Sequence, residues 1–290
     1  MATDIIKLRR DFRKRIRKEA VLLPGAFNAL SAKLAEKAGF KGVYISGAAL
    51  SAGSGLPDLG LLTLTEFAAM AKTIAQAVKI PCISDADTGF GETVNVGRTV
   101  QEFENAGLCG LHIEDQVMPK RCGHLSGKEL VSAQAMVQKI RIAVRSRRDK
   151  NFLVIARTDA RAAEGIKGAL KRAEEYVKAG ADAIFPEALK TPAEFRRFAK
   201  EIDVPLLANM TEFGVSPLLT FEELRDMGYR MVIFPVSALR VAMKAVEGFY
   251  RGLRKQGTQQ AFVAEMQTRK ELYDLIEYEK YEAMDKKSGG

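Results

Sequence analysis

The stretch NAGLCGLHIED (105–115) joins the end of a helix to an apolar strand, and the same arrangement occurs at three other places. Each copy has a helix-ending glycine, a short link and an apolar run that favours a strand. The glycine suits the left-handed position that ends a helix. The other copies are KAGFKGVYIS (37–46), KAGADAIFPEA (178–188) and DMGYRMVIFPVS (226–237). A chain built from this unit alternates helices and strands.

Four more runs extend the alternation. KIPCISDAD (79–87) and DVPLLANMT (203–211) place a proline at the start of a strand, where a missing N–H is tolerated. FLVIARTD (152–159) and AVLLPGAFN (20–28) are also rich in strand-forming residues. The expected strands lie near 21–24, 43–46, 82–85, 110–114, 152–157, 183–186, 205–208 and 231–234.

Helical periodicity fills the segments between these strands, as in TEFAAMAKTIAQAV (65–78). Near-continuous apolar strands that alternate with helices indicate a parallel sheet covered by helices. Eight such units predict an α/β fold of the (β/α)8 TIM-barrel type. A doubly wound open sheet is the alternative, but no G-x-G-x-x-G motif follows the first strand.

Both ends of the chain predict additional helices. Residues 257–285 indicate a C-terminal helical extension, and no linker interrupts 20–250, so we expect one barrel domain over 1–290. The N-terminal segment has the 3–4 spacing of an amphipathic helix laid against the barrel. The apolar face of this helix comprises Ile5, Leu8, Phe12 and Ile16.

Composition restricts the possible classes of protein. A content of 47% hydrophobic and 28% charged residues is typical of a globular protein. The three cysteines form no C-x-x-C pair and are odd in number, which indicates a reducing compartment, the cytoplasm, rather than a disulfide framework. Two histidines are too few for a zinc site. No apolar run has the length of a membrane span, and the N-terminus lacks the apolar region of a secretory signal.

The net charge of +9 raises the question of nucleic-acid binding. Basic residues gather in 1–20 and in KIRIAVRSRRDK (139–150), but neither segment interleaves aromatic residues as a base-stacking surface does. We therefore expect two solvated helix faces and no nucleic-acid partner.

Polar residues follow the predicted strands at the end where a barrel enzyme carries its chemistry. A single one could be a loop residue without a role, but eight such residues together, from seven of the eight predicted strands, are too many for a coincidence. These residues are Ser46, Asp85, Asp87, Glu114, Arg157, Glu187, Asn209 and Arg240.

Asp85 and Asp87, in SDADTGFGE (84–92), are two residues apart and share one face of a strand, so both carboxylates can reach one ion. Oxygen ligands without sulfur or imidazole suit Mg²⁺, which binds through one or two carboxylates and keeps several waters. The alternative is an Asx turn that caps a helix. Glu114 and Asp115 at the end of the next strand favour the magnesium site, since they could hold metal-bound waters.

Arginines indicate an anionic substrate. Arg157, Arg240 and Arg269 are candidates for carboxylate recognition, because a guanidinium binds a carboxylate through two parallel hydrogen bonds. A lone arginine is more often part of a surface salt bridge, whereas three near a metal indicate a substrate with several carboxylates. Asn209 and Thr211 could add neutral donors.

The segment PKRCGHLSGKEL (119–130) places Cys122 between cations. Lys120, Arg121 and His124 should favour the thiolate and ease proton exchange near neutral pH. No nucleophile motif of the G-x-S-x-G kind surrounds Cys122, so a general acid or base is the better interpretation. Cys82 and Cys109 lie in apolar strands and predict inert core residues.

The motifs KRCGH, SDADTGFG, LHIEDQ, ARTDA, FPEA and NMTEFG, in combination, resemble the isocitrate lyase/phosphoenolpyruvate mutase superfamily over nearly the whole chain. Within it they are most similar to the branch that cleaves 2-methylisocitrate in propionate breakdown. The resemblance implies a Mg²⁺-dependent barrel and a homotetramer whose last barrel helix is exchanged between neighbours.

The resemblance also implies residue roles. Asp85 and Asp87 would hold Mg²⁺, and Cys122 would be the catalytic acid or base. Ala48 departs from a glycine that is frequent in relatives, which matters if this position needs a positive φ. The implied substrate contacts are Ser46, Gly47, Ala48, Cys122, Gly123, Arg157, Glu187, Asn209, Met210, Thr211, Arg240 and Arg269.

The implied reaction is a retro-aldol cleavage of the tricarboxylate 2-methylisocitrate to pyruvate and succinate, with Cys122 protonating the succinate carbon. Tyr44, Asp58 and Glu114 are all candidates for removing the hydroxyl proton. Phe185, Phe234 and Pro235 could form a wall for the methyl group. Isocitrate lyase, oxaloacetate hydrolase and dimethylmalate lyase, which share the C-G-H loop, remain alternatives. A non-catalytic nucleic-acid-binding barrel would give the acidic strand ends no purpose.

Overall fold

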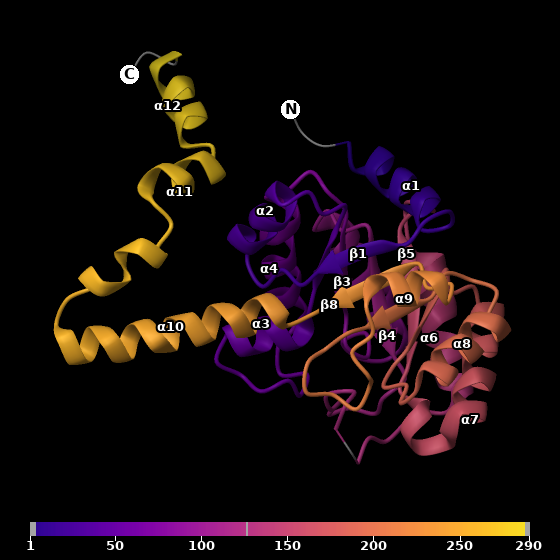
Figure 1. Ribbon diagram of the computed structural model, residues 1–290. Helices are drawn as coiled ribbons and strands as arrows, with labels where there is room; N and C mark the ends of the chain where they lie inside the picture. The colour runs from indigo at the N-terminus through magenta and orange to yellow at the C-terminus, as the bar shows by residue number, and fades with distance from the viewer. Residues whose placement is uncertain (1–3, 126, 288–290) are drawn as a thin grey trace.

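The computed structural model describes residues 4–125 and 127–287, so the ends of the expected 1–290 domain and residue 126 lie outside the described residues. The described strands are parallel and form a barrel surrounded by helices (Figure 1). They begin and end close to the predicted positions; β5 begins one residue later and β7 two residues later than predicted. The strands are β1 (Val21–Pro24), β2 (Val43–Ile45), β3 (Cys82–Asp85), β4 (Gly110–Glu114), β5 (Leu153–Thr158), β6 (Ala183–Pro186), β7 (Leu207–Asn209) and β8 (Met231–Phe234).

The barrel consists of two hydrogen-bonded sheets. One has the order β2-β3-β4-β5-β6 and the other β1-β8-β7. Isolated parallel bridges, Gly25 with Tyr44 and Ile184 with Leu206, join the two sheets into a ring. The register places Glu114 of β4 opposite Arg157 of β5, so an acid and a guanidinium lie side by side at the carboxyl end of the barrel.

Helices cover the outside of the ring, and most start at a side-chain cap. Thr63 and Glu66, for example, form a reciprocal capping box at the start of α4. The covering helices are α2 (Ala29–Lys37), α3 (Gly47–Gly53), α4 (Leu64–Gln76), α5 (Thr93–Asn105), α6 (Ala133–Ser146), α7 (Ala160–Lys178), α8 (Pro192–Glu201) and α9 (Phe221–Asp226). An outer apolar core lies between helices and strands, and an inner one fills the barrel.

The N-terminal helix α1 (Ile5–Arg15) packs against the amino end of the barrel, as its apolar spacing predicts. Phe12 and the following Ile16 are buried in the same cluster as the inward-facing strand residues. They close the end of the barrel opposite to the polar strand ends. Among the described residues, α1 therefore covers the amino end of the barrel, and the polar strand ends lie at the opposite end.

The prediction that both basic segments are solvated faces is wrong in part. Arg9 is 5% exposed and donates hydrogen bonds to the carbonyls of Leu108 and Glu104. Lys139 is 4% exposed and donates to the carbonyl of Thr88 at 3.0 Å. Amphipathic spacing identified the apolar face of each helix. It could not predict that the long side chains of Arg9 and Lys139 extend past this face and bury their charged groups on backbone carbonyls.

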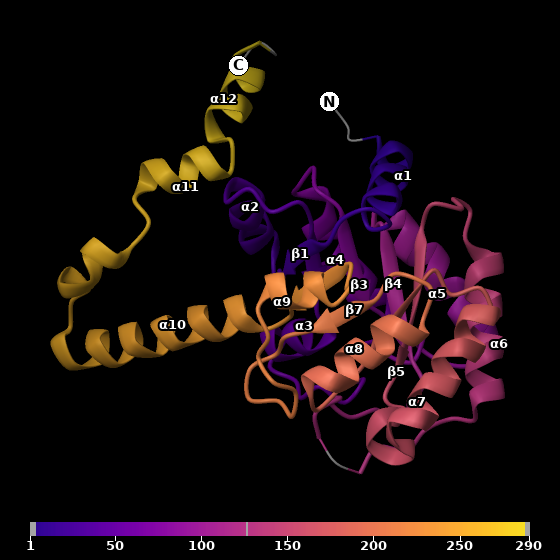
Figure 2. The same cartoon turned by 45° about the vertical axis from the view of Figure 1, so that its right-hand side comes forward.

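The C-terminal part leaves the barrel. Helix α10 (Ser237–Gln256) projects outward, and a 3-10 helix η1 (Gln260–Glu265), α11 (Arg269–Leu275) and α12 (Tyr278–Lys287) follow it (Figures 1 and 2). Leu239 is the buried residue of α10. Several large apolar side chains of this helix are exposed, namely Val241, Met243, Val246 and Tyr250. Within the described residues, no helix combines the length and the hydropathy needed to cross a membrane.

Candidate active site

A pocket lies at the carboxyl ends of the strands, where the polar residues were predicted to meet. Predicted contacts that line it are Ser46, Ala48, Cys122, Gly123, Arg157, Glu187, Asn209 and Thr211, together with Asp85. Tyr44, Asp58, Phe185 and Pro235 also line it, whereas Phe234 and Glu114 do not. Phe234 instead packs against the outer core. The structure thus brings most of the predicted contacts together in one pocket and changes part of its predicted wall.

The two predicted metal ligands converge. Asp85 and Asp87 are each 5% exposed, and a methyl group built on Gly47 would lie 2.8 Å from Oδ2 of Asp85 and 3.3 Å from Oδ1 of Asp87. Both oxygens therefore approach one point. Asp87 has a φ of +44°, a conformation that aspartate tolerates better than most residues.

The electrostatics of this pair favour a bound cation. Burial, together with the adjacent Asp85 carboxylate, raises the pKa of Asp87 to about 6. Oδ1 of Asp87 is buried without a hydrogen bond of good geometry, although Nζ of Lys120 lies 3.0 Å away. The described residues contain no cluster of three or more metal-binding side chains, so two carboxylates would be completed by water and substrate. This donor set fits Mg²⁺.

Lys120 was not among the predicted site residues, and it is the cation nearest to the carboxylates. It is 3% exposed and contacts both Asp58 and Asp87. Burial disfavours its charge, but the carboxylates of Asp87, Glu114 and Asp85 hold its pKa above the usual range. In the sequence, its position two residues before Cys122 predicted that it favours the Cys122 thiolate.

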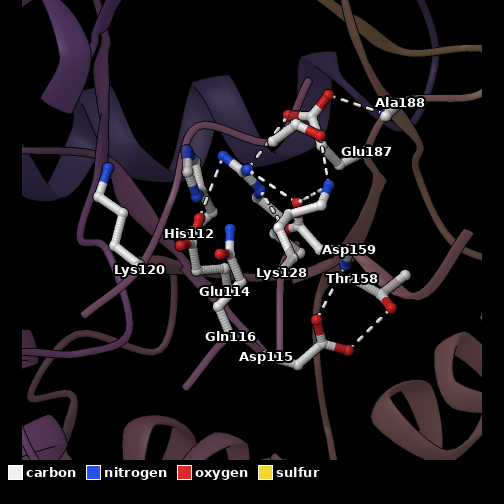
Figure 3. A network of polar contacts seen from close by, with 12 residues as sticks. His112, Glu114, Asp115, Gln116, Lys120, Lys128, Thr158, Asp159, Glu187 and Ala188 are labelled. Atoms are coloured by element: carbon white, nitrogen blue, oxygen red, sulfur yellow. Dashed lines mark hydrogen bonds and ion pairs between the residues drawn. The ribbon is translucent and has the colours of Figure 1, made fainter. Parts of the chain in front are cut away.

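Arg157 is the centre of a buried ion-pair network, and Figure 3 labels its partners Glu114, Asp159 and Glu187. Its guanidinium donates to both oxygens of Asp159, at 2.8 and 3.2 Å, and lies 3.2 Å from Glu114 and 3.4 Å from Glu187. Burial disfavours the charge of Arg157, but these carboxylates keep its pKa well above the usual range. A fixed guanidinium that lines the pocket is suited to bind a substrate carboxylate.

Cys122 is half-buried on the pocket wall, and the prediction that its neighbours favour the thiolate is wrong. Burial raises the pKa of the Cys122 thiol, and a hydrogen bond from the His124 backbone and the charge of Arg157 lower it only in part. Lys120 is directed to Asp58 and Asp87, and Arg121 is exposed. The thiol therefore holds its proton at neutral pH, as a proton donor must.

His112 was counted in the sequence only as a possible metal ligand, yet it lies beneath the pocket. Its Nε2 is 2.7 Å from the Tyr44 hydroxyl, and its ring stacks on Tyr44 and meets the edge of Phe185. Burial lowers the pKa of His112 to about 4, so the ring is neutral at pH 7. A neutral imidazole can accept the Tyr44 proton or hold its hydroxyl in place.

His124 connects the cysteine segment to two other strand ends. Its Nε2 lies 3.0 Å from Glu187, and its Nδ1 accepts a hydrogen bond from the Val215 backbone N–H at 3.1 Å. Burial opposes ionisation of Glu187, but Arg157 and His124 hold the pKa of its carboxyl well below the usual range. Asn209 also donates to Glu187 at 3.2 Å.

The remaining predicted contacts lie around or beyond the pocket. Met210 is buried beside β7 and does not line it. Arg240 is half exposed, 3.6 Å from Glu212 and over the ring of Phe213. Arg269 is exposed at the start of α11. Ala48 belongs to helix α3 and has no positive φ, so a glycine is not required there.

Fold and site together define a barrel enzyme for an anionic ligand, with an acid pair, a buried arginine and a thiol at the carboxyl ends of its strands. Residues 12–254 match the family described as phosphoenolpyruvate phosphomutase. The chain belongs to this family.

Curated and solved relatives agree with that assignment. A 2-methylisocitrate lyase of Halalkalibacterium halodurans is 51% identical over 95% of this chain and 91% of its own. A crystal structure of 2,3-dimethylmalate lyase, a PEP mutase/isocitrate lyase superfamily member, superposes with a TM-score of 0.92 at 35% identity, covering 100% of this chain and 97% of the other. A phosphonopyruvate hydrolase in complex with oxalate and Mg²⁺ gives 0.87 at 35% identity, covering 97% and 98%.

Proposed function

We propose that this protein is a Mg²⁺-dependent carbon–carbon lyase that cleaves 2-methylisocitrate to pyruvate and succinate in the methylcitrate cycle of propionate catabolism. The main support is one arrangement in the site: Cys122, whose thiol pKa is raised by burial, lines the same pocket as Arg157 and Asp85. The 51% identity to a 2-methylisocitrate lyase along almost the full length of both chains supports the choice of substrate.

The residues would divide the work as follows. Asp85 and Asp87 would hold Mg²⁺, which when bound supplies a Lewis acid for the hydroxy-acid end of the substrate. Arg157 would bind a carboxylate of the substrate. As the carbon–carbon bond breaks, its electron pair would pass to the succinate fragment, and Cys122 would donate its proton to that carbon. Neutral donors would come from Asn209 and Thr211, both of which line the pocket.

The three candidates for taking the hydroxyl proton differ in their contacts. Glu114 is 1% exposed, pairs with Arg157 and does not line the pocket. Asp58 lines it but is engaged by Lys120, and Tyr44 lines it with its hydroxyl on His112. We propose that Asp58 receives this proton, or that Tyr44 receives it while passing its own hydroxyl proton to Nε2 of His112. The wider substrate shell, including Ser46, Gly47, Ala48, Gly123, Met210, Arg240 and Arg269, remains part of the proposal.

Substrate selectivity is the first expected result. Phe185 and Pro235 line the pocket and could contact the extra methyl group. Since one methyl group contributes a discrimination of about 10–200-fold, we expect kcat/KM for 2-methylisocitrate to exceed that for isocitrate by this factor. Pyruvate release from 2-methylisocitrate, and glyoxylate release from isocitrate, measure it.

The same assay tests the other members of the C-G-H branch. Dimethylmalate and oxaloacetate should be poorer substrates than 2-methylisocitrate. Equal kcat/KM for 2-methylisocitrate and isocitrate would refute the substrate assignment and leave the lyase class intact. Release of products only from dimethylmalate or oxaloacetate would move the protein to that activity.

We also propose a cytoplasmic homotetramer in which α10 is exchanged between neighbours. The exposed apolar residues Val241, Met243 and Tyr250 on the projecting helix support an exchange, because they need a surface to cover them. The three free cysteines support the reducing compartment. Light scattering should give four times the 31.9 kDa chain mass, and Val241→Glu with Met243→Glu should lower it. A monomeric mass for the unmodified protein would contradict the exchange.

A further inference from the structure

Lys128 has contacts that neither the proposed reaction nor the predicted site uses. Its side chain is 2% exposed, and its ammonium group contacts two acceptors, the backbone carbonyl of Gly123 and Oδ1 of Asp159 at 2.8 Å. Figure 3 shows Lys128 beside Asp159. Gly123 directly follows Cys122, so this lysine fixes the backbone that carries the thiol.

The second acceptor ties that backbone to the substrate-binding arginine. Asp159 receives both hydrogen bonds of Arg157, and its own backbone N–H donates to Asp115 at 2.9 Å. Asp115 is held in turn by the hydroxyls of Thr158 and Tyr176, each at 2.8 Å. Asp159 is therefore a fixed point, and Lys128 joins the cysteine segment to it.

The fit around Gly123 shows how close this approach is. A methyl group built there would lie 2.4 Å from Nη2 of Arg157 and 2.5 Å from Cγ of Glu187. The pocket is correspondingly small, about 60 Å³, whereas ligand pockets commonly measure about 300–1,000 Å³. A tricarboxylate can enter only if the segment that carries Cys122 moves away from Arg157 and then returns.

We infer that Lys128 is a positioning residue that holds the Cys122 segment closed over the site, by clamping the Gly123 carbonyl onto the Asp159 carboxylate that also orients Arg157. Closure and the orientation of the carboxylate-binding guanidinium thus share one anchor. The inference rests on the proposed function for its kinetic consequence, but the closed position of the thiol can be measured without any substrate.

The experiment measures alkylation of Cys122 by iodoacetamide in the substrate-free protein, followed by peptide mass spectrometry. Lys128→Met removes the charge and keeps most of the chain length. Loss of a hydrogen bond to a charged group should favour the open position of the Cys122 segment by about 10–100-fold. The alkylation rate of Cys122 should rise by the same factor. Lys128→Arg keeps the charge and should retain most of the protection.

The chain offers a matched control at the other end of the barrel. Arg147 also bridges a carbonyl and a carboxylate, donating to Phe152 at 2.9 Å and to Asp182 at 2.5 Å. Arg147→Met and Lys128→Met should both unfold at a lower urea concentration than the unmodified protein. Arg147→Met should not change the alkylation rate of Cys122. The buried Cys82 and Cys109 report global unfolding, since they react only when the core opens.

Kinetics provide the second measurement. With the substrate that the protein cleaves, Lys128→Met should lower kcat by about 10²-fold, because a displaced thiol no longer meets the carbon, and change KM less. Wild-type alkylation of Cys122 in Lys128→Met would overturn the inference, whatever the substrate. Faster alkylation of Cys122 in Lys128→Met would support the clamp even if the unmodified protein released no pyruvate from 2-methylisocitrate. That second result would refute the proposed function instead. If Lys128→Met does not fold, Lys128→Arg and Lys128→Gln are compared in the same assay, and equal alkylation rates in these two would overturn it.

Discussion

Cys122→Ser is expected to lower kcat for pyruvate release by about 10²–10⁴-fold and to leave the affinities for substrate and Mg²⁺ near those of the unmodified protein. Serine has nearly the size of cysteine, and its hydroxyl is far less acidic than a thiol, so it cannot deliver a proton to the succinate carbon in time. Turnover assays and calorimetric titration with substrate measure the two parts.

The pH dependence follows from the same thiol. Burial raises the pKa of Cys122, and the donor must be protonated, so kcat should fall only as the pH rises through a value above that of an ordinary thiol. Cys82→Ser and Cys109→Ser are the controls. These cysteines are 2% and 0% exposed, so their variants should lose stability and keep kcat. Near-normal turnover in Cys122→Ser would require another acid, with His124 the first to test.

Loss of either acidic ligand is expected to abolish turnover while the fold is retained. Asp85→Ala removes one carboxylate, and Asp87→Asn is the sharper variant for the other, because asparagine tolerates the φ of +44°. In both, the substrate alkoxide would lose its Lewis acid. The exposed Asp226, which pairs with its neighbour Arg225, gives the control Asp226→Asn, for which full activity is expected.

Stability separates the role of Asp87 from a structural one. In the metal-free protein the pKa of Asp87 is raised to about 6, because the folded state disfavours its charge. The free energy of unfolding should therefore fall as the pH rises from the pKa of this carboxyl in the unfolded chain through about 6. Asp87→Asn should therefore unfold at a higher urea concentration at pH 7 while losing activity. Full activity of the unmodified protein in excess chelator would contradict the proposed dependence on Mg²⁺.

The sequence was most informative where local chemistry alone determines structure. Glycines or prolines mark where a helix ends and a strand begins at six of the eight strands, which is why the strand positions were predicted closely. In a parallel barrel all strands end on the same rim, so Asp85, Arg157 and Glu187 could be placed together without knowing any distance.

Contacts that depend on the path of a loop could not be predicted in this way. Lys120 is two residues before Cys122 in the sequence, but its ammonium group contacts Asp58 and Asp87. Lys128 reaches Asp159, and the Gln116 side chain pairs with the backbone of Arg121, only because the segment folds back on itself. The sequence places charges along the chain, whereas the pKa of Cys122 depends on how deeply the fold buries it.

The two sheets of the barrel meet at two seams, each marked by a single isolated bridge, and the pocket lies across both. Arg157 belongs to a strand of one sheet and Glu187 follows another, whereas Asn209 belongs to a strand of the other sheet and Pro235 follows one. A bound tricarboxylate would therefore fasten together two half-cylinders that share little backbone bonding. A ligand that binds only the folded barrel raises the free energy of unfolding. The binding energy of the substrate would therefore stabilise the barrel as well as contribute to the reaction.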